Sequence, residues 1–136
     1  MKQGKRVKLK FPIEYLLLMT PKHKEREKKT IVFVALRTVN EFTNFLYEIV
    51  VEPVLNDRML RLRIQGLRAP QVSIPGTGPA KFSTEFANLR GNYSVVISKP
   101  NGQENSFEVN ITNEKVVVEK KPRERFVDLV TNEEEW

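Results

Sequence analysis

The chain has no cysteine and only one histidine, and these two shortages exclude several kinds of chemistry. Without cysteine there is no thiol nucleophile, no disulfide and no thiolate ligand for a metal. The single histidine, His23, lies among lysines, whose positive charge disfavours a bound cation. Histidine metal sites and Ser-His-Asp catalysis are therefore not expected. We expect no cofactor and no metal.

Long apolar runs are also missing. The best run, residues 15–19, is far shorter than the roughly 20 residues that a membrane-spanning helix needs, so no transmembrane segment is expected. Pro12 and Glu14 interrupt the apolar region that a signal peptide requires. We therefore expect a cytoplasmic protein if the N-terminus is native. A secreted or periplasmic protein is expected if the chain is a piece trimmed from a longer precursor.

Basic residues outnumber acidic ones, 23 to 17, but they are unevenly distributed. Residues 1–29 hold ten basic residues against three acidic ones, whereas the remainder is close to neutral. A basic segment of this kind can bind nucleic acid or another anionic surface. The simpler alternative is a solvated basic surface. The residues that would contact an anionic partner are Lys22, Lys24, Arg26, Lys28 and Lys29.

The clearest structural pattern is a β-hairpin over residues 89–112. Apolar side chains fall on odd positions in both halves and polar side chains on even ones, which is the period of half-buried strands. A two-residue turn would pair apolar with polar positions, whereas a three-residue loop at residues 100–102 pairs Tyr93 with Val109. Gly102 then takes the left-handed position of the loop.

Leu89, Gly91 and Tyr93 form an L-x-G-x-Y corner immediately before this hairpin. The corner resembles the one that precedes the penultimate strand of immunoglobulin-like sandwiches. The resemblance implies that the tyrosine hydroxyl bonds back to the backbone of the corner and that the glycine serves the bend. The chain differs from antibody domains because it has no cysteines, and the resemblance brings no functional residues.

The N-terminal part predicts two strands with a charged stretch between them. Apolar residues alternate on odd positions from 7 to 19, which predicts a first strand, and Pro12 favours an edge position for it. Residues 20–29 have no apolar side chain to bury and predict an exposed loop or a short frayed helix. Residues 31–39 are apolar on both parities, which fits a strand covered on both sides or a buried helix.

A second hairpin is predicted over residues 46–67. A turn at residues 56–57 separates polar from apolar side chains and places Glu52 opposite Arg61, so that opposite charges face each other across the strands. The carboxylate pairs visible in the sequence are predicted to lie on outward faces, opposite basic or polar residues. These pairs are Glu48/Glu52 and Glu104/Glu108.

The remaining segments are shorter. Residues 68–80 are rich in proline and glycine and predict a loop without the spacing of a phosphate-binding motif. Residues 81–86 and 115–119 predict strands. From residue 120 a charged linker leads to residues 126–130, for which an extra strand, a disordered end and docking on a partner are all open.

Together these patterns predict an all-β protein, an immunoglobulin-like antiparallel sandwich of seven or eight strands. Residues 1–119 form the domain, with the charged loop at 20–29, and residues 120–136 form a linker and C-terminal tail. We expect a non-catalytic interaction module that binds another protein or joins an assembly. The alternatives are nucleic-acid or anionic-surface binding through residues 1–29 and, more remotely, a carbohydrate-active hydrolase.

Overall fold

The computed structural model describes residues 12–70 and 75–136, and within them every strand prediction can be compared with the structure. No α-helix occurs in this part of the chain, so the all-β prediction is confirmed, and no helix there is long and apolar enough to cross a membrane. The elements are β1 (Tyr15–Lys24), β2 (Lys29–Phe42), β3 (Glu48–Asn56), β4 (Met59–Arg68), β5 (Gly78–Ala87), β6 (Gly91–Ser98), β7 (Glu104–Ile111), β8 (Val116–Lys120), β9 (Val127–Val130) and the short 3-10 helix η1 (Glu133–Glu135).

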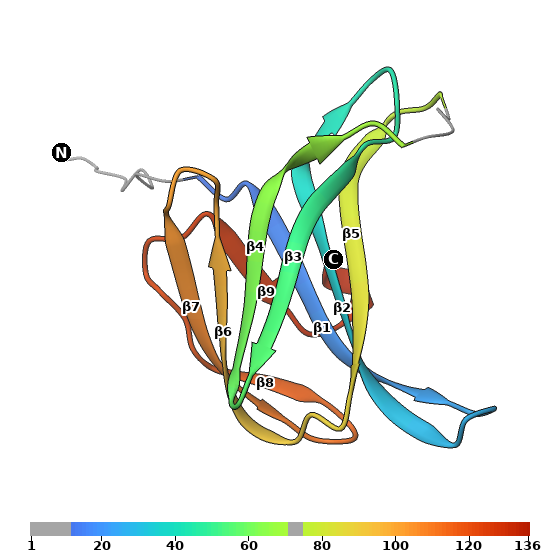
Figure 1. Ribbon diagram of the computed structural model, residues 1–136, viewed down its shortest axis with the longest axis vertical. Coiled ribbons are helices and arrows are strands. Elements are labelled where there is room, and N and C mark those ends of the chain that lie inside the picture. The colour runs from blue at the N-terminus through green and yellow to red at the C-terminus, as the bar shows by residue number, and fades with distance from the viewer. Residues whose placement is uncertain (1–11, 71–74) are drawn as a thin grey trace, which may run out of the picture.

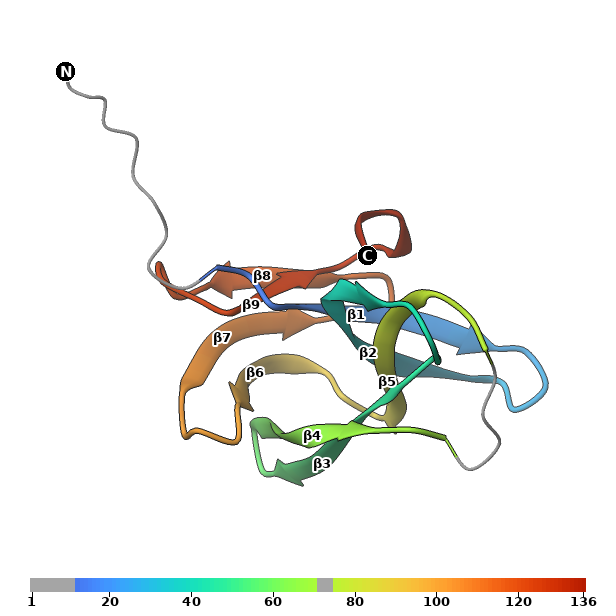
Figure 2. The same cartoon turned by 90° about the horizontal axis from the view of Figure 1, so that it is seen from above.

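All nine strands belong to one sheet with the order β8-β7-β6-β4-β3-β5-β2-β1-β9. Three neighbouring pairs are parallel, namely β1 with β9, β3 with β5, and β4 with β6. The sheet curls until β8 approaches β1, which gives a nearly closed, barrel-like shape (Figure 1, Figure 2). The expected arrangement of seven or eight antiparallel strands does not form, because the tail supplies a ninth strand and three strand pairs are parallel.

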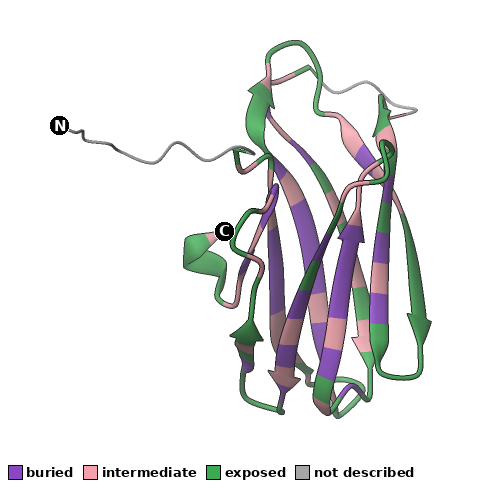
Figure 3. Cartoon of the chain, turned by 90° about the vertical axis from the view of Figure 1, so that its left-hand side faces the viewer, coloured by how far each residue is buried: buried purple, intermediate pink, exposed green. Residues whose placement is uncertain are grey.

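The core fills the inside of the barrel, and buried residues alternate with more exposed ones along several strands (Figure 3). Val32, Val34 and Leu36 on β2 are at most 1% exposed. Phe107 of β7 and Phe126 just before β9 are buried against the same cluster. Apolar burial of this extent is the main favourable contribution to folding.

β2 is also covered on its outer face. Leu18 of β1 and Ala35 of β2 point outward and are nevertheless buried. Trp136 lies over this face, and its indole Nε1 donates a hydrogen bond to the backbone oxygen of Leu16 at 3.0 Å. The prediction of a strand covered on both sides at residues 31–39 is therefore confirmed.

The charged stretch at residues 20–29 is not a loop or a helix. β1 and β2 continue through it and leave only residues 25–28 as a turn. Strand pairing persists because long polar side chains can cover apolar neighbours: Lys22 packs its ammonium 4.3 Å from the centre of the Phe33 ring. His23 is exposed, as predicted. Residues 7–11 of the predicted first strand lie outside the described residues.

The hairpin of β6 and β7 has the predicted register. Tyr93 lies opposite Val109. The N–H of Lys99 donates to the backbone oxygen of Gln103 at 2.9 Å, which closes a three-residue loop. Gly102 takes the left-handed conformation with φ of +92°. Turn chemistry and alternation agree at this place, and both predictions are confirmed.

The hairpin of β3 and β4 has a different register from the predicted one. Its two-residue turn is at Asp57 and Arg58, so Glu52 lies opposite Arg63 and not opposite Arg61. A shift of two residues keeps every side chain on the same face, so the polar and apolar pattern fits both registers. The turn decides between them, because Asp57 adopts a left-handed φ of +57°.

Residues 126–130 form part of the sheet. β9 pairs in parallel with β1, and Phe126 before it is 2% exposed. The amide oxygen of Asn105 accepts hydrogen bonds from the backbone N–H groups of Phe126 at 2.8 Å and Val127 at 3.2 Å. Of the three alternatives left by the sequence, the structure shows the extra strand, so the expected tail is a packed element.

Candidate functional site

β3 and β5 are neighbours in the sheet, but they pair at a single place. Glu48 faces Lys81, and the N–H of Lys81 donates to the backbone oxygen of Tyr47 at 3.3 Å. From there the two strands separate toward the β3–β4 turn (Figure 1). Within residues 12–70 and 75–136, no other strand pairs with either of the two edges. The barrel is therefore open along this line, and we call it the β3–β5 opening.

Burial decreases along β3 as the strand leaves β5. Val51, Pro53 and Leu55 lie opposite buried residues of β4, so their side chains point toward the core. Ile49, next to the pairing site, is 2% exposed, whereas Val51 is half-buried and Leu55 is 42% exposed. Core-facing side chains thus reach solvent through the opening.

On the other side of the opening, the core-facing side chains of β5 are also incompletely buried. Phe82, Thr84 and Phe86 lie opposite the buried inward-facing residues of β2, yet all three are only half-buried. Two aromatic rings that should lie in the core are consequently accessible. An exposed apolar surface framed by polar residues is typical of an interaction site.

The backbone of β5 is also unpaired along the opening. In an antiparallel ladder, successive residues direct their N–H and C=O groups to opposite sides. Because Lys81 directs its N–H to β3, Ser83, Glu85 and Ala87 direct theirs into the opening, while the residues between them face β2. An unpaired edge of this kind is a template for another strand.

β3 presents a matching edge. Its odd-numbered residues face β5, since the backbone oxygen of Tyr47 accepts the bond from Lys81. Val51 and Leu55 therefore offer both a donor and an acceptor, and Pro53 offers only its carbonyl. Proline is confined to edge strands in sheets. This proline is the one signal in the sequence that could have located the edge.

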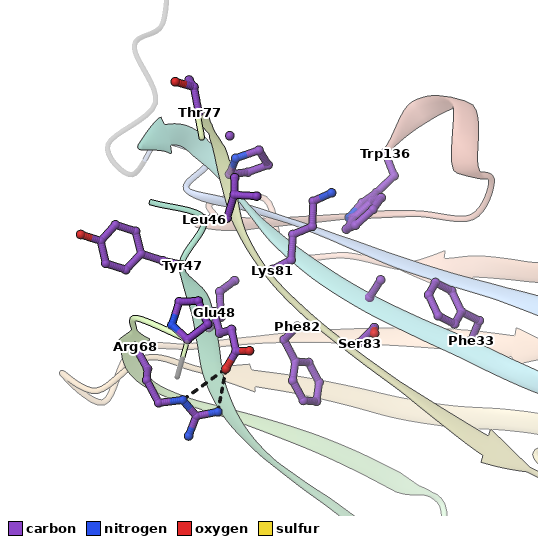
Figure 4. Close-up of a pocket in the computed structure, with 15 residues that line it drawn as sticks. Phe33, Leu46, Tyr47, Glu48, Arg68, Thr77, Lys81, Phe82, Ser83 and Trp136 are labelled. Carbon is purple, nitrogen blue, oxygen red and sulfur yellow. Dashed lines mark hydrogen bonds and ion pairs between the residues drawn. The ribbon is translucent and has the colours of Figure 1, made fainter. Parts of the chain in front are cut away.

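A pocket of about 920 Å³ lies where the two strands divide (Figure 4). Lys81 points from β5 toward Trp136, and Phe82 projects from the opposite side of the same strand. Arg68 and Glu48 form an ion pair of 2.8 Å at the rim. The pocket extends the opening at its narrow end and offers aromatic, apolar and charged walls.

Trp136 is held in place at this pocket by several contacts. Nε of Arg37 donates to its backbone oxygen at 2.7 Å. The Arg37 guanidinium and the Lys81 ammonium lie 5.8 Å and 5.7 Å from the centre of the indole ring. Cations at these distances are attracted by the face of the ring. The pocket therefore has a fixed aromatic wall.

The predicted contacts for an anionic partner lie at the tip of the β1–β2 hairpin. Three of them are already paired with carboxylates, and the pairs are Lys22–Glu133 at 3.5 Å, Lys24–Glu85 at 2.8 Å and Lys29–Glu27 at 3.3 Å. The hydrogen bond to Glu85 raises the pKa of Lys24. Arg26 and Lys28 are exposed in the turn. Much of the positive charge at this tip is thus balanced within the molecule.

The predicted corner, Leu89, Gly91 and Tyr93, is held by contacts from the side chain of Arg58. Leu89 and Tyr93 are buried, and Gly91 has a positive φ of +89°. The Arg58 guanidinium lies 5.0 Å from the centre of the Tyr93 ring, and its Nη1 donates to the backbone oxygen of Arg90. Among the described residues, which include the whole corner, the Tyr93 hydroxyl has no hydrogen-bond partner, so the predicted bond back to the corner is not formed.

The carboxylates considered for acid-base chemistry all lie on outward faces, where each forms an ion pair or a hydrogen bond. Their partners are Arg68 for Glu48, Arg63 for Glu52, Arg61 for Glu104 and the Ser94 hydroxyl for Glu108. In the part of the chain that the structure describes, no three histidine, aspartate or glutamate side chains lie together in a way that could hold a metal.

Comparison with known proteins yields no relative. No protein-family model matches the chain, and neither a curated protein nor a solved structure is significantly similar to it. The β3–β5 opening is therefore the feature from which a function can be inferred.

Proposed function

We propose that this protein is a non-catalytic protein-binding module that accepts an extended peptide as an additional strand in the β3–β5 opening. The observation that carries the proposal is the pair of unpaired strand edges, at residues 51–55 and 83–87, which face the same opening. A peptide strand between them would satisfy backbone groups on both sides.

The opening has the geometry that one inserted strand needs. β3 and β5 run parallel to each other, so a single strand between them can be antiparallel to both. Alternate side chains of that strand would point toward Leu55, Phe82 and Phe86, and should be apolar. The others would point to solvent beside Glu52 and Glu85, and should be polar or basic.

The expected affinity is moderate. Burying three apolar side chains of the peptide contributes on the order of 5–9 kcal/mol, at about 1.5–3 kcal/mol for each. Ordering a flexible peptide and losing its free translation offset part of this gain. Backbone hydrogen bonds along the two edges add specificity for an extended conformation. We therefore expect binding in the micromolar range.

We also propose that this domain is related to immunoglobulin-like domains in the broad sense. This relationship is supported by the corner at Leu89, Gly91 and Tyr93, and domains of that kind commonly present edges and loops to partners. Anionic-surface binding, the other class indicated by the sequence, is less favoured because the ion pairs of Lys22, Lys24 and Lys29 reduce the charge available to a partner.

A pair of matched substitutions tests the proposal. Val54 and Leu55 are adjacent on β3 and 41% and 42% exposed, but only Leu55 points into the opening. The probe is a fluorescent peptide of about eight residues in which valine and phenylalanine alternate with serine and threonine. Its control has the same composition in two blocks. Binding is measured by fluorescence anisotropy.

We expect the alternating peptide to bind and the block peptide to bind weakly or not at all. Leu55→Lys should weaken binding by about tenfold or more, because it places a charge on the core-facing side of the open β3 edge. Val54→Lys should change it by less than about twofold. No binding, equal binding of the two peptides, or equal losses in the two variants would contradict the proposal.

A further inference from the structure

We infer that the strand which fills the β3–β5 opening is the N-terminal segment of a second copy of this chain, residues 6–11, so that molecules join head to tail. The inference rests on the proposed function and names the partner. It follows from the side-chain pattern of the segment, from the charges beside the opening, and from the place at which the segment joins the barrel.

The segment has the two-sided pattern that the opening requires. Every second residue is apolar, and every intervening residue up to position 10 is basic. The apolar residues are Val7, Leu9 and Phe11, and the basic ones are Arg6, Lys8 and Lys10. In a strand the first set would face the half-buried rings of Phe82 and Phe86, and the second set would face solvent.

Charges beside the opening favour a basic strand. On the solvent side of the two open edges lie Glu52 of β3 and Glu85 of β5, and residues 52–56 and 83–87 include no basic side chain. The basic residues of an inserted strand would lie directly across from these carboxylates. Glu52 and Glu85 are already paired with Arg63 and Lys24 in their own chain, which reduces the charge they offer to a partner, so charge makes a small contribution beside the side-chain pattern.

The segment joins the barrel away from the opening of its own chain. It precedes Tyr15, which lies opposite Thr38, and the Thr38 hydroxyl accepts the N–H of Ala80 at 2.9 Å. β1 therefore starts at the end of the sheet where β3 and β5 still pair, whereas the opening widens toward the other end. β2 and β5 also lie between β1 and the opening in the sheet order. These positions favour the opening of a neighbouring molecule.

An exchange of this kind has different donor and acceptor surfaces. Such a heterologous contact produces open chains, or rings if the rotation between neighbours closes. Each isolated molecule would offer one opening and one N-terminal segment. A variant that cannot donate its segment, or cannot accept one in its opening, could only occupy the end of a chain of molecules.

The test uses the full-length chain and two variants in sedimentation equilibrium. Leu9→Asp disables the donor segment, and Leu55→Lys disables the opening. We expect the parent to gain mass with increasing concentration and each variant alone to remain monomeric. An equimolar mixture of the two should form a dimer and nothing larger, because one working donor meets one working opening. Val54→Gln, a neutral change on the solvent side of the same edge, is the control and should assemble like the parent.

Two further measurements distinguish a loss of assembly from a loss of folding. Far-UV circular dichroism shows whether each variant is folded, and Val7→Asp replaces Leu9→Asp if the latter is not. A synthetic peptide of residues 5–13 should dissociate the assembled parent. A parent that stays monomeric, with no dimer in the mixture, overturns the inference. If the alternating probe peptide still binds in that case, the proposed function stands, and if it does not, both fall.

Discussion

Asn105 is the polar side chain on which the attachment of the last strand depends. It is 6% exposed, its amide nitrogen donates to the backbone oxygen of Glu104 at 3.1 Å, and its oxygen accepts two backbone N–H groups at the start of β9. A buried donor that loses its partner keeps its full desolvation penalty. One side chain thus decides whether residues 126–130 pack or detach.

Replacing this asparagine should therefore be costly. Asn105→Ala leaves the N–H groups of Phe126 and Val127 without their acceptor, and we expect a loss of roughly 2–4 kcal/mol in the free energy of unfolding. Urea denaturation measures the loss. The matched change Asn92→Ala removes an exposed asparagine whose oxygen accepts one hydrogen bond from Asn110 at 2.8 Å, and it should cost less than about 1 kcal/mol. Similar losses from the two changes would show that the bonds of Asn105 contribute little.

Tyr15 gives the protein a sensitivity to alkaline pH. Burial raises the pKa of its hydroxyl above the usual 10.0, and the nearby charge of Glu14 raises it further. A group whose pKa is higher in the folded state stabilises that state below its unfolded pKa, and the contribution is lost as pH rises through the folded value. Stability from this group should therefore decline above about pH 10.

The variant Tyr15→Phe isolates that contribution. The ring stays available for its edge-on contact with Phe126, at 6.5 Å between centres, while the ionisable group is gone. Denaturation midpoints at neutral pH and above pH 10 should show a smaller alkaline decline for the variant than for the parent. Parallel declines in the two proteins would mean that other groups cause the alkaline loss.

At the scale of the elements, the β3–β4 hairpin provides a test of register. Glu52 lies opposite Arg63, and their charged groups are 3.5 Å apart, while Arg61 pairs with Glu104 at 2.8 Å. A double-mutant cycle on Glu52 and Arg63 should give a coupling of roughly 0.2–1 kcal/mol that decreases with salt. The cycle on Glu52 and Arg61 should give none, and the reverse result would restore the register predicted from the sequence.

The two hairpins show which information the sequence carried. The β6–β7 register could be predicted, because alternation excluded the two-residue turn and Gly102 fitted the three-residue loop. In the β3–β4 hairpin, alternation allowed two registers, and the left-handed conformation of Asp57 decided between them. The alternation of polar and apolar residues therefore predicts which face of the sheet a side chain occupies. It cannot distinguish two registers that differ by two residues, and the turn decides between them.

The candidate site could not be predicted in the same way. The β3–β5 opening depends on which strands meet after a long excursion of the chain, and no local pattern encodes that meeting. Pro53 could have marked β3 as an edge strand, but nothing in the sequence marks β5 as its diverging neighbour. β9 was similarly ambiguous, because the acceptor that fixes it comes from Asn105, 21 residues away in the sequence.

At the scale of the whole molecule, two lines along which the barrel is not closed are important. β8 approaches β1 at one of them, and β3 diverges from β5 at the other. At the second line two aromatic residues of the core, Phe82 and Phe86, are half-buried beside unpaired strand edges, so a further strand there would extend the core. Filling it should stabilise the folded state by mass action.

Hydrogen exchange of the β5 amides tests this account most directly, in the Leu9→Asp variant, which we expect to be monomeric. Ser83, Glu85 and Ala87 should exchange rapidly, whereas their neighbours, whose N–H groups face β2, should be protected. Adding the alternating peptide should protect the three fast amides. Three amides that are already protected in the isolated monomer, or that stay fast with saturating peptide, would contradict the claim that β5 offers a free edge to an incoming strand.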